Sequence, residues 1–358
     1  MPKVSIACRC YNHSHTLKNT ITSVLNQTFS DWELIIVDDN STDNSVDIIR
    51  SFSDSRIKLY VNDRNLGVVG NLNRCISLCT GEYIAILDAD DMFAPDKLQV
   101  QVDFLDSNPE YGAVFSYVSF LTDETTNPKE LEYVEKLINT PSGNRAEMLR
   151  KFFLRENFLA FPTEMFRREF AIKFPENLIA MGDCNFHIQT LMKTNIKVIE
   201  QPLTIYNMQN MDKHVSTWTS FYVHKIEGVY VYSSFCKMTD LALFCDVFSG
   251  LYEGFGIPTS RAIPYFIARI LLDDPDRELF GLCLFSKIFN NDTYLQYIMK
   301  NFDFTYADFL RLRRGRDKAP VIEYKRLFGI PFIKVKYAKG CTKKYFLGIQ
   351  YSVSKPKQ

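Results

Sequence analysis

Short apolar runs alternate with helical patterns from residue 4 to residue 118, and this alternation limits the folds open to the chain. The runs lie at 4–8, 34–37, 57–61, 83–87 and 113–118. They are continuously apolar, as is typical of strands that are covered on both faces. Between them apolar residues recur at helical spacing, as at Leu17, Ile21 and Val24. The pattern predicts an α/β fold with a mainly parallel sheet flanked by helices.

The rest of the chain changes character twice. We expect the α/β domain to span 1–220, because mixed strand and helix patterns continue that far. Phe, Tyr and Leu then recur at helical spacing, which predicts an α-helical region over 221–312. In 313–358 apolar residues alternate with lysines, and the motif at 327–330 is echoed at 346–349. This last segment is predicted to form a small basic β-hairpin tail.

Charge is distributed unevenly, although the formal net charge of the chain is zero. Residues 311–358 hold fourteen Lys or Arg side chains and only two acids, Asp317 and Glu323. Aromatic residues lie between the lysines, so an anionic membrane surface is the expected partner of this segment. A solvated basic face is the alternative. No nucleic-acid partner is expected, because no motif of nucleic-acid recognition accompanies the charge.

Cysteines and hydropathy give an expectation for location. The nine cysteines form no paired C-x-x-C sets, which argues against zinc and for a reducing compartment. The first residues enter a strand without the charged start and apolar stretch of a signal peptide. No run of about 18 apolar residues would make a membrane span. We expect a cytoplasmic protein, held peripherally on the inner face of the cell membrane.

Acidic clusters directly follow two of the predicted strands. Asp38 and Asp39 follow the second strand, and Asp88, Asp90 and Asp91 follow the fourth. The carboxyl ends of parallel strands meet at one edge of a sheet, where ligands bind. Carboxylates gathered there repel each other, and a hard divalent cation such as Mg²⁺ or Mn²⁺ relieves the repulsion. Because Mg²⁺ usually shares phosphate oxygens, a nucleoside diphosphate is the expected ligand.

Two common nucleotide-binding motifs are absent from the sequence. There is no G-x-x-x-x-G-K-S/T loop, and no G-x-G-x-x-G follows the first strand, which leads into Arg9, Cys10, Tyr11 and Asn12. A P-loop NTPase is therefore excluded, and the missing glycines argue against a nicotinamide dehydrogenase. A sugar nucleotidylyltransferase remains as an alternative, although the expected Gly-rich loop is missing. A non-catalytic carbohydrate-binding subunit of the same fold is the other alternative.

The order and spacing of several motifs resemble glycosyltransferase family 2. The matching motifs are Tyr11-Asn12, Val37-Asp38-Asp39-Asn40-Ser41, Asn65-Leu66-Gly67, Thr80-Gly81-Glu82 and Asp88-Ala89-Asp90-Asp91. The resemblance covers about 2–105 closely and continues weakly to about 216. It implies a GT-A fold and an inverting hexosyl- or N-acetylhexosaminyltransferase. The implied donor is a nucleotide-sugar, most often a UDP-sugar. The implied acceptor is a glycan or a lipid-linked molecule, in bacterial surface polysaccharide synthesis.

The resemblance also implies roles for single residues. The residues expected to bind the nucleotide are Arg9, Tyr11, Asp39, Asn65, Asn73 and Asp88. Within this set Tyr11 would stack on the base, Asp39 would read the base edge and Asp88 would face the ribose. Asp38 is expected to brace the turn after its strand.

The metal and the base are implied in the same way. Either Asp90 or Asp91 would bind Mn²⁺ or Mg²⁺, with His214 as a further ligand. Asp183, at the start of a helical pattern, would be the catalytic base that accepts the proton of the acceptor hydroxyl. Glu164 is the weaker second candidate for the base.

Overall fold

The computed structural model describes residues 1–154, 157–209, 221–314, 321–327, 330–336, 342–346 and 349–354. Its centre is an eight-stranded sheet with the strand order β3-β2-β1-β4-β7-β6-β8-β5. The strands are β1 (Val4–Cys10), β2 (Trp32–Asp38), β3 (Ile57–Val61), β4 (Tyr83–Asp88), β5 (Met92–Phe93), β6 (Tyr111–Leu121), β7 (Met165–Arg167) and β8 (Asn195–Asn207).

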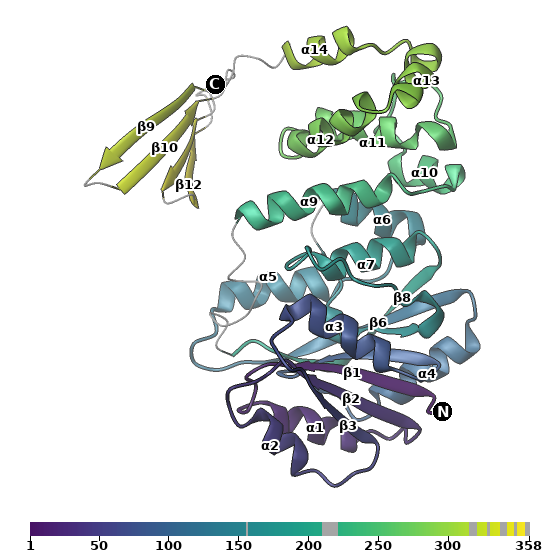
Figure 1. Ribbon diagram of the computed structural model, residues 1–358, viewed down its shortest axis with the longest axis vertical. Coiled ribbons are helices and arrows are strands. Elements are labelled where there is room, and N and C mark those ends of the chain that lie inside the picture. Colours follow the sequence, from purple (N-terminus) through teal and green to yellow (C-terminus); the bar gives the residue numbers. More distant parts are fainter. Residues whose placement is uncertain are drawn as a thin grey trace.

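The predicted α/β fold is confirmed, with a sheet that is mixed beyond its first four strands. Strands β3, β2, β1 and β4 are parallel to one another. The short strand β7 lies antiparallel between β4 and β6, whereas β6 and β8 are parallel again. Strand β5 is antiparallel to β8 at the edge. In Figure 1 helices cover both faces of this sheet.

The helices around the sheet are α1 (Leu17–Leu25), α2 (Ser45–Arg50), α3 (Gly67–Leu78), α4 (Lys97–Ser107), α5 (Pro128–Ile138), α6 (Arg145–Leu154) and α7 (Gly182–Leu191), with short 3-10 turns η1 (Phe161–Thr163) and η2 (Arg168–Phe170). Alternate residues of β1 bury on opposite faces, as the two-residue period of a strand requires. Ile6 packs in the cluster that includes residues of α1 and α4. Ala7 packs in the cluster that includes residues of α3, α6 and α7.

The register of the parallel strands aligns their carboxyl ends. Arg9 pairs with Val37 of β2 on one side and with Asp88 of β4 on the other, and Cys10 pairs with Asp38. The two acidic segments that lie about fifty residues apart in sequence therefore leave the sheet at the same edge, on either side of β1. This placement is the one that the strand pattern predicted.

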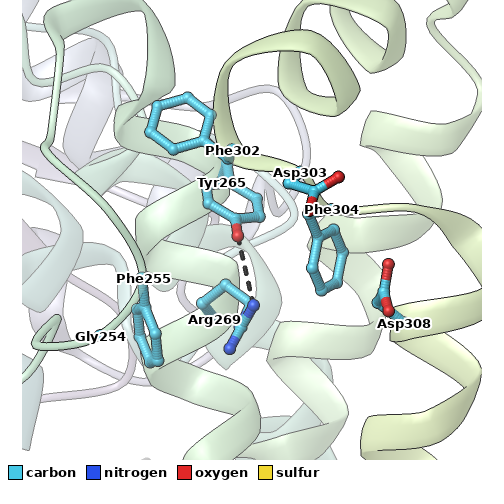
Figure 2. Close-up of a pocket in the computed structure, with 8 residues that line it drawn as sticks. All are labelled: Gly254, Phe255, Tyr265, Arg269, Phe302, Asp303, Phe304 and Asp308. Carbon is cyan, nitrogen blue, oxygen red and sulfur yellow. Dashed lines mark hydrogen bonds between the residues drawn. The ribbon is translucent and has the colours of Figure 1, made fainter.

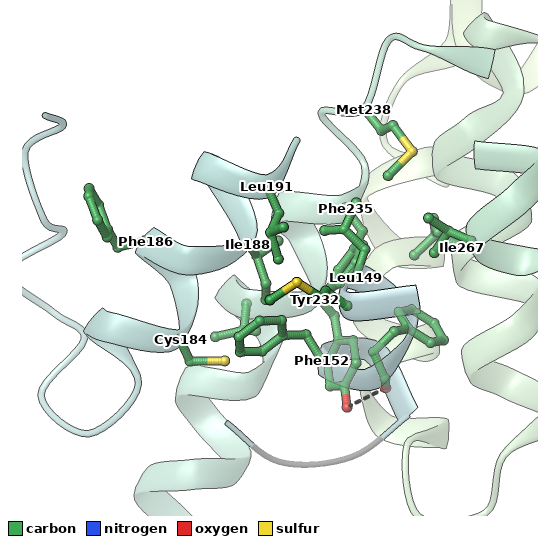
Figure 3. Close-up of a cluster of buried hydrophobic side chains, with 14 of the residues drawn as sticks. Leu149, Phe152, Cys184, Phe186, Ile188, Leu191, Tyr232, Phe235, Met238 and Ile267 are labelled. Atoms are coloured by element: carbon green, nitrogen blue, oxygen red, sulfur yellow. Dashed lines mark hydrogen bonds between the residues drawn. The ribbon is translucent and has the colours of Figure 1, made fainter. Parts of the chain in front are cut away.

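Helices alone follow β8 as far as Arg314 in the described part of the chain. They are α9 (Phe221–Phe235), α10 (Leu241–Phe248), α11 (Ile263–Asp273), α12 (Glu278–Phe289), α13 (Asp292–Phe302) and α14 (Tyr306–Arg314), with the 3-10 turn η4 (Ser260–Ala262) before α11. Figure 3 shows Phe152 of α6, Ile188 of α7 and Phe235 of α9 in one buried cluster, with Ile267 of α11 beyond them. The hydrophobic core thus runs continuously from the sheet into the helical region.

The basic tail is larger than predicted. It forms a four-stranded antiparallel sheet, whereas the sequence indicated a single hairpin. The strands are β9 (Val321–Leu327), β10 (Ile330–Lys336), β11 (Thr342–Phe346) and β12 (Ile349–Ser354). Leu327 pairs with Ile330, and Phe346 pairs with Ile349, so each copy of the repeated motif joins its own pair of strands. None of the helices in the described ranges has the length and hydrophobicity of a membrane span.

Candidate active site

Arg9 and Asp88 face each other at the ends of neighbouring strands. Arg9 Nε donates to Asp88 Oδ1 at 2.6 Å, and the two side chains are 27% and 20% exposed. Burial disfavours the charged guanidinium, but the carboxylates of Asp88, Asp90 and Asp183 hold the pKa of Arg9 above its usual value. Arg9 is therefore a cation among acids that come from β4 and from α7.

The acids after β4 differ in their surroundings. Asp91 is buried and accepts a hydrogen bond at 2.8 Å from the backbone N–H of Asn207, at the end of β8. Burial, together with the charges of Asp90 and Asp88, raises the pKa of Asp91 well above its usual value. Asp90 is partly exposed, and its carboxylate has no hydrogen bond or ion pair within the described residues. Asp90 is thus the member of this run whose carboxylate is available to a ligand.

Asp39 holds the start of α3 in place. Its buried carboxylate accepts hydrogen bonds from Asn62 Nδ2 at 2.6 Å and from the backbone N–H groups of Leu66 and Gly67 at 2.8 and 3.0 Å. A carboxylate at this end of a helix meets unpaired N–H groups and the positive end of the helix dipole. Asp38 instead braces the turn after β2, since it accepts from the N–H and Oγ of Ser41.

Three other predicted nucleotide ligands lie at different places around this edge. Tyr11, which follows β1, is 45% exposed, so its ring is accessible. Asn65 is exposed and accepts from the N–H of Gly67 at 2.9 Å. Asn73 is engaged at both ends of its amide, because Nδ2 donates to the Phe174 carbonyl at 2.9 Å and Oδ1 accepts from the Phe174 N–H at 2.8 Å. These contacts tie α3 to the backbone of Phe174, and they occupy the amide that was predicted to contact the nucleotide.

Asp183 lies in the first turn of α7, where the sequence placed it. Its Oδ2 accepts from Asn157 Nδ2 at 2.8 Å, and its Oδ1 accepts from the N–H of Cys184 at 2.7 Å. Burial raises the pKa of Asp183, whereas the nearby charges of His187 and Arg9 lower it. Tyr206 of β8 has the acids after β4 and Asp183 among its charged neighbours. The structure thus brings Asp183 to the edge of the sheet where Arg9, Asp88 and Asp90 lie.

Comparison with known proteins places this arrangement in a family. The family model described as Glycosyl transferase family 2 matches residues 5–174. An uncharacterized glycosyltransferase of Methanocaldococcus jannaschii is 31% identical over 222 residues, which cover 60% of this chain and 74% of that protein. The chain belongs to glycosyl transferase family 2. It is therefore an enzyme, a glycosyltransferase, as the order of its motifs predicted.

One further relative is named as a glucosyltransferase, and a solved structure shares the fold. The UDP-Glc:alpha-D-GlcNAc-diphosphoundecaprenol beta-1,3-glucosyltransferase WfgD of Escherichia coli is 42% identical over 166 residues, covering 44% of this chain and 64% of WfgD. Residues 1–349 of S. aureus TarS, solved in complex with UDP, superpose with a TM-score of 0.55 at 16% identity, over 97% of this chain and 99% of that one. This likeness to TarS shows the GT-A-like fold, including the helical region.

A buried cluster of charged groups lies behind Asp183 in this family 2 chain. His187, one helical turn after Asp183, has its Nε2 atom 3.3 Å from Glu164 Oε2, and neither side chain is exposed. Burial raises the pKa of Glu164, although His187 opposes the shift. Lys97 of α4 is also fully buried, donates to Gln101 Oε1 at 2.6 Å and to the Thr163 carbonyl at 3.0 Å, and has its pKa lowered by burial to about 7.

Sequence reasoning missed Lys97 and His187. Lys97 lies in an ordinary helical pattern, where lysine usually faces solvent. The spacing of four residues from Asp183 was the available signal for His187, because residues four apart share a helix face. Glu164, predicted as a rival base, is instead enclosed in the core.

The donors at the sheet edge fit a hard divalent cation in part. Asp90 offers an unoccupied carboxylate, and carboxylate oxygen is the ligand type that Mg²⁺ and Mn²⁺ prefer. The described residues contain no group of three or more His, Cys, Asp or Glu side chains arranged to hold a metal. His214, the other predicted ligand, lies outside the described residues. Mg²⁺ characteristically completes its shell with water and substrate phosphates, so one protein carboxylate is compatible with such a site.

Proposed function

We propose that this family 2 glycosyltransferase is a metal-dependent, inverting enzyme that moves a hexose or N-acetylhexosamine from a UDP-sugar to a glycan or lipid-linked acceptor. The bacterial surface polysaccharide is the proposed product. One observation carries the proposal: the partly exposed Asp90, without a hydrogen bond or ion pair in the described part of the chain, lies near Arg9 and Asp183. A cation, a carboxylate for metal and a carboxylate for base are thus gathered at one edge.

The donor is proposed from the relatives and from groups that follow β1, β2 and β3. WfgD and WfaP of Escherichia coli, 42% and 35% identical to parts of this chain, are both named as UDP-Glc transferases. TarS has been solved with UDP and with UDP-GlcNAc. In this chain Tyr11 presents an accessible ring for stacking on the base. Asp39 and Asn65, at the start of α3, would line the base and ribose, whereas Asn73 is occupied by Phe174.

Asp88 and Arg9 would act on the ribose and diphosphate as a pair. The ion pair between them fixes both side chains, so little further ordering is needed when a nucleotide binds. Arg9 remains charged at any physiological pH, which suits it to a phosphate oxygen. Asp90 would hold the Mn²⁺ or Mg²⁺, with His214 as a second ligand. The metal, when bound, supplies Lewis-acid stabilisation of the charge that develops on the leaving diphosphate.

Asp183 is the proposed base for the chemical step. Its carboxylate takes the proton of the acceptor hydroxyl while that oxygen forms a bond to the anomeric carbon and the bond from this carbon to the diphosphate breaks. A single displacement of this kind inverts the anomeric configuration and needs one base. The raised pKa of Asp183 makes it a stronger base than an exposed aspartate. Glu164, enclosed beneath α7, has no comparable access to an acceptor.

The family assignment removes support from the alternative of a nucleotidylyltransferase. The non-catalytic alternative would require donor binding without turnover, which a transfer assay detects directly.

For the basic tail we propose an anionic membrane surface as the partner. The full chain should sediment with vesicles that contain anionic lipid and remain in solution with neutral ones, and salt should weaken the binding. Equal sedimentation with both kinds of vesicle would reject this partner, and with it a peripheral location at the inner membrane face.

A titration of UDP with and without Mn²⁺ tests the proposed site. UDP should raise the melting temperature of the full chain, and Mn²⁺ should increase the shift, because a ligand that binds only the native state stabilises it. Asp90→Asn should abolish the effect of Mn²⁺. The matched control is Asp103→Asn, an exposed acid of α4, which should behave as wild type. A wild-type Mn²⁺ response in Asp90→Asn would remove Asp90 from the proposed metal site.

A further inference from the structure

A hollow lies in the helical region, formed by elements that the proposed chemistry does not use. It is a cavity of about 400 Å³, a volume in the usual range of small-ligand sites. The residues that line it are Gly254, Phe255, Tyr265, Arg269, Phe302, Asp303, Phe304 and Asp308. Figure 2 shows them converging from α11, from the loop before it, from the end of α13, from the connection that follows and from α14.

Arg269 is the central polar group of this cavity. Its guanidinium carbon lies 4.3 Å from the ring centroid of Phe255 and 4.9 Å from that of Phe304. One terminal nitrogen donates to the hydroxyl of Tyr265 at 3.2 Å. Its Nε is buried and has no hydrogen-bond partner in the described ranges. Such a donor is costly to bury without an acceptor, which indicates that a ligand or water accepts from it.

The backbone around the cavity adopts conformations that favour particular residues. Gly254 and Gly256 flank Phe255 with φ angles of +83° and +106°, a region that other residues rarely adopt. A Cβ on Gly256 would also lie 3.0 Å from the ring of Phe302. Asp303 has a left-handed φ of +47° at the end of α13 and is exposed. A left-handed residue at this position is a common way for a helix to end.

The charges on the wall indicate the class of ligand. The lining residues carry one guanidinium, that of Arg269, and two carboxylates, those of Asp303 and Asp308, so a phosphate or another anion would meet net repulsion. Asp308 Oδ2 also accepts from the N–H and hydroxyl of Thr305. A neutral polyol avoids that repulsion, since its hydroxyl groups can accept from Arg269 and donate to a carboxylate. Aromatic surfaces such as Phe302 and Tyr265 supply apolar area for the C–H face of a pyranose ring.

We infer that this cavity is a carbohydrate subsite, which binds a neutral sugar unit of the acceptor glycan away from the sheet edge where transfer occurs. The inference rests on the proposed glycan acceptor. A subsite in the helical region would add binding energy from a part of the acceptor that does not react, and such energy can support orientation at the reacting group. It would also favour an acceptor long enough to reach both places over a single sugar.

Saturation-transfer NMR on the full chain, with cellobiose and N,N′-diacetylchitobiose as probes, tests the subsite. Irradiation of aromatic protein protons should transfer saturation to the pyranose C–H protons, and saturating UDP should leave this transfer unchanged. Asp303→Asn, which keeps a residue that tolerates the left-handed conformation, should weaken binding about tenfold. Arg269→Lys should weaken it similarly. Asp292→Asn, an exposed acid at the start of α13, is the matched control and should bind as wild type.

The following outcomes would each contradict the proposed subsite. No transfer to either disaccharide at millimolar concentration would do so, as would transfer that survives both Asp303→Asn and Arg269→Lys. Competition by UDP would assign the sugar to the donor site, and inorganic phosphate that displaces the probes would indicate an anion site. The melting shift with UDP is measured on the same samples. A chain that binds UDP but no disaccharide loses this inference alone, whereas a chain that binds disaccharide but no UDP loses the proposed donor.

Discussion

The Nε2 atom of His187, a residue of α7, lies 3.3 Å from Oε2 of Glu164, and both side chains are completely buried. Lys97 reaches the same part of the core from α4, and its charge acts on Glu164. Burial raises the pKa of Glu164, and the charges of His187 and Lys97 oppose that shift. Their charge states bear on the stability of the domain and on the environment of Asp183.

Lys97→Met should change how stability depends on pH. The folded-state pKa of Lys97 is about 7, below its unfolded value, so the unfolded chain binds more protons between that pH and the ordinary pKa of lysine. Burial of Lys97 is therefore most costly below about pH 7, and wild type recovers stability as the pH rises. The free energy of unfolding of Lys97→Met, relative to wild type, should fall by about 1.4 kcal/mol for each pH unit above 7.

Urea unfolding from pH 6 to pH 10 measures this difference. Lys129→Met, on the exposed face of α5, is the control and should show no such slope relative to wild type. A constant difference between Lys97→Met and wild type across the whole range would show that Lys97 keeps an ordinary pKa in the folded chain.

Asn157→Ala should move the pH dependence of transfer. Asn157 Nδ2 donates to Asp183 Oδ2 at 2.8 Å, and a donor of this kind stabilises the charged carboxylate. Its removal should raise the pKa of Asp183 further, so the acidic limb of the rate profile should shift to higher pH. The measurement is UDP release with acceptor present, followed against pH.

Asp183→Asn provides the reference for that experiment. It should lower the rate by about 10²–10⁴, the usual contribution of a general base, while UDP binding stays close to wild type. An acidic limb that stays in place in Asn157→Ala, or moves to lower pH, would separate Asn157 from the ionisation that controls the rate.

Gly81→Ala should destabilise the domain without touching the site. A Cβ at Gly81 would lie 2.6 Å from the backbone nitrogen of Ser5 and 2.9 Å from the carbonyl carbon of Val4, so the backbone would have to move. The expected loss is about 1–3 kcal/mol, as for other overpacked positions, measured by urea unfolding. Gly182→Ala is the control, since its nearest contact would be Phe174 at an ordinary 3.6 Å. Equal stability of the two variants would contradict the close approach seen at Gly81.

The sequence was sufficient to predict the parallel strands β1 to β4 and their acidic edge. Apolar runs such as Leu34–Val37 require cover on both faces, and the acids that follow them can lie only where the strands end. The position of Asp183 at the start of a helix was also visible, because helix-period residues follow it. These features depend on local pattern and on the general geometry of parallel strands.

Only the tertiary structure determines which of these side chains can contact a ligand. Asp91 accepts a hydrogen bond from the Asn207 N–H, whereas Asp90 does not. This difference arises because β8, more than a hundred residues later in the chain, packs beside Asp91. Asn73 is occupied by Phe174, and Lys97 and His187 are buried, although their residue types predict exposure or ligand binding. Hydrogen-bond partners and burial are properties of packed neighbours distant in sequence, so neither spacing nor residue type could reveal them.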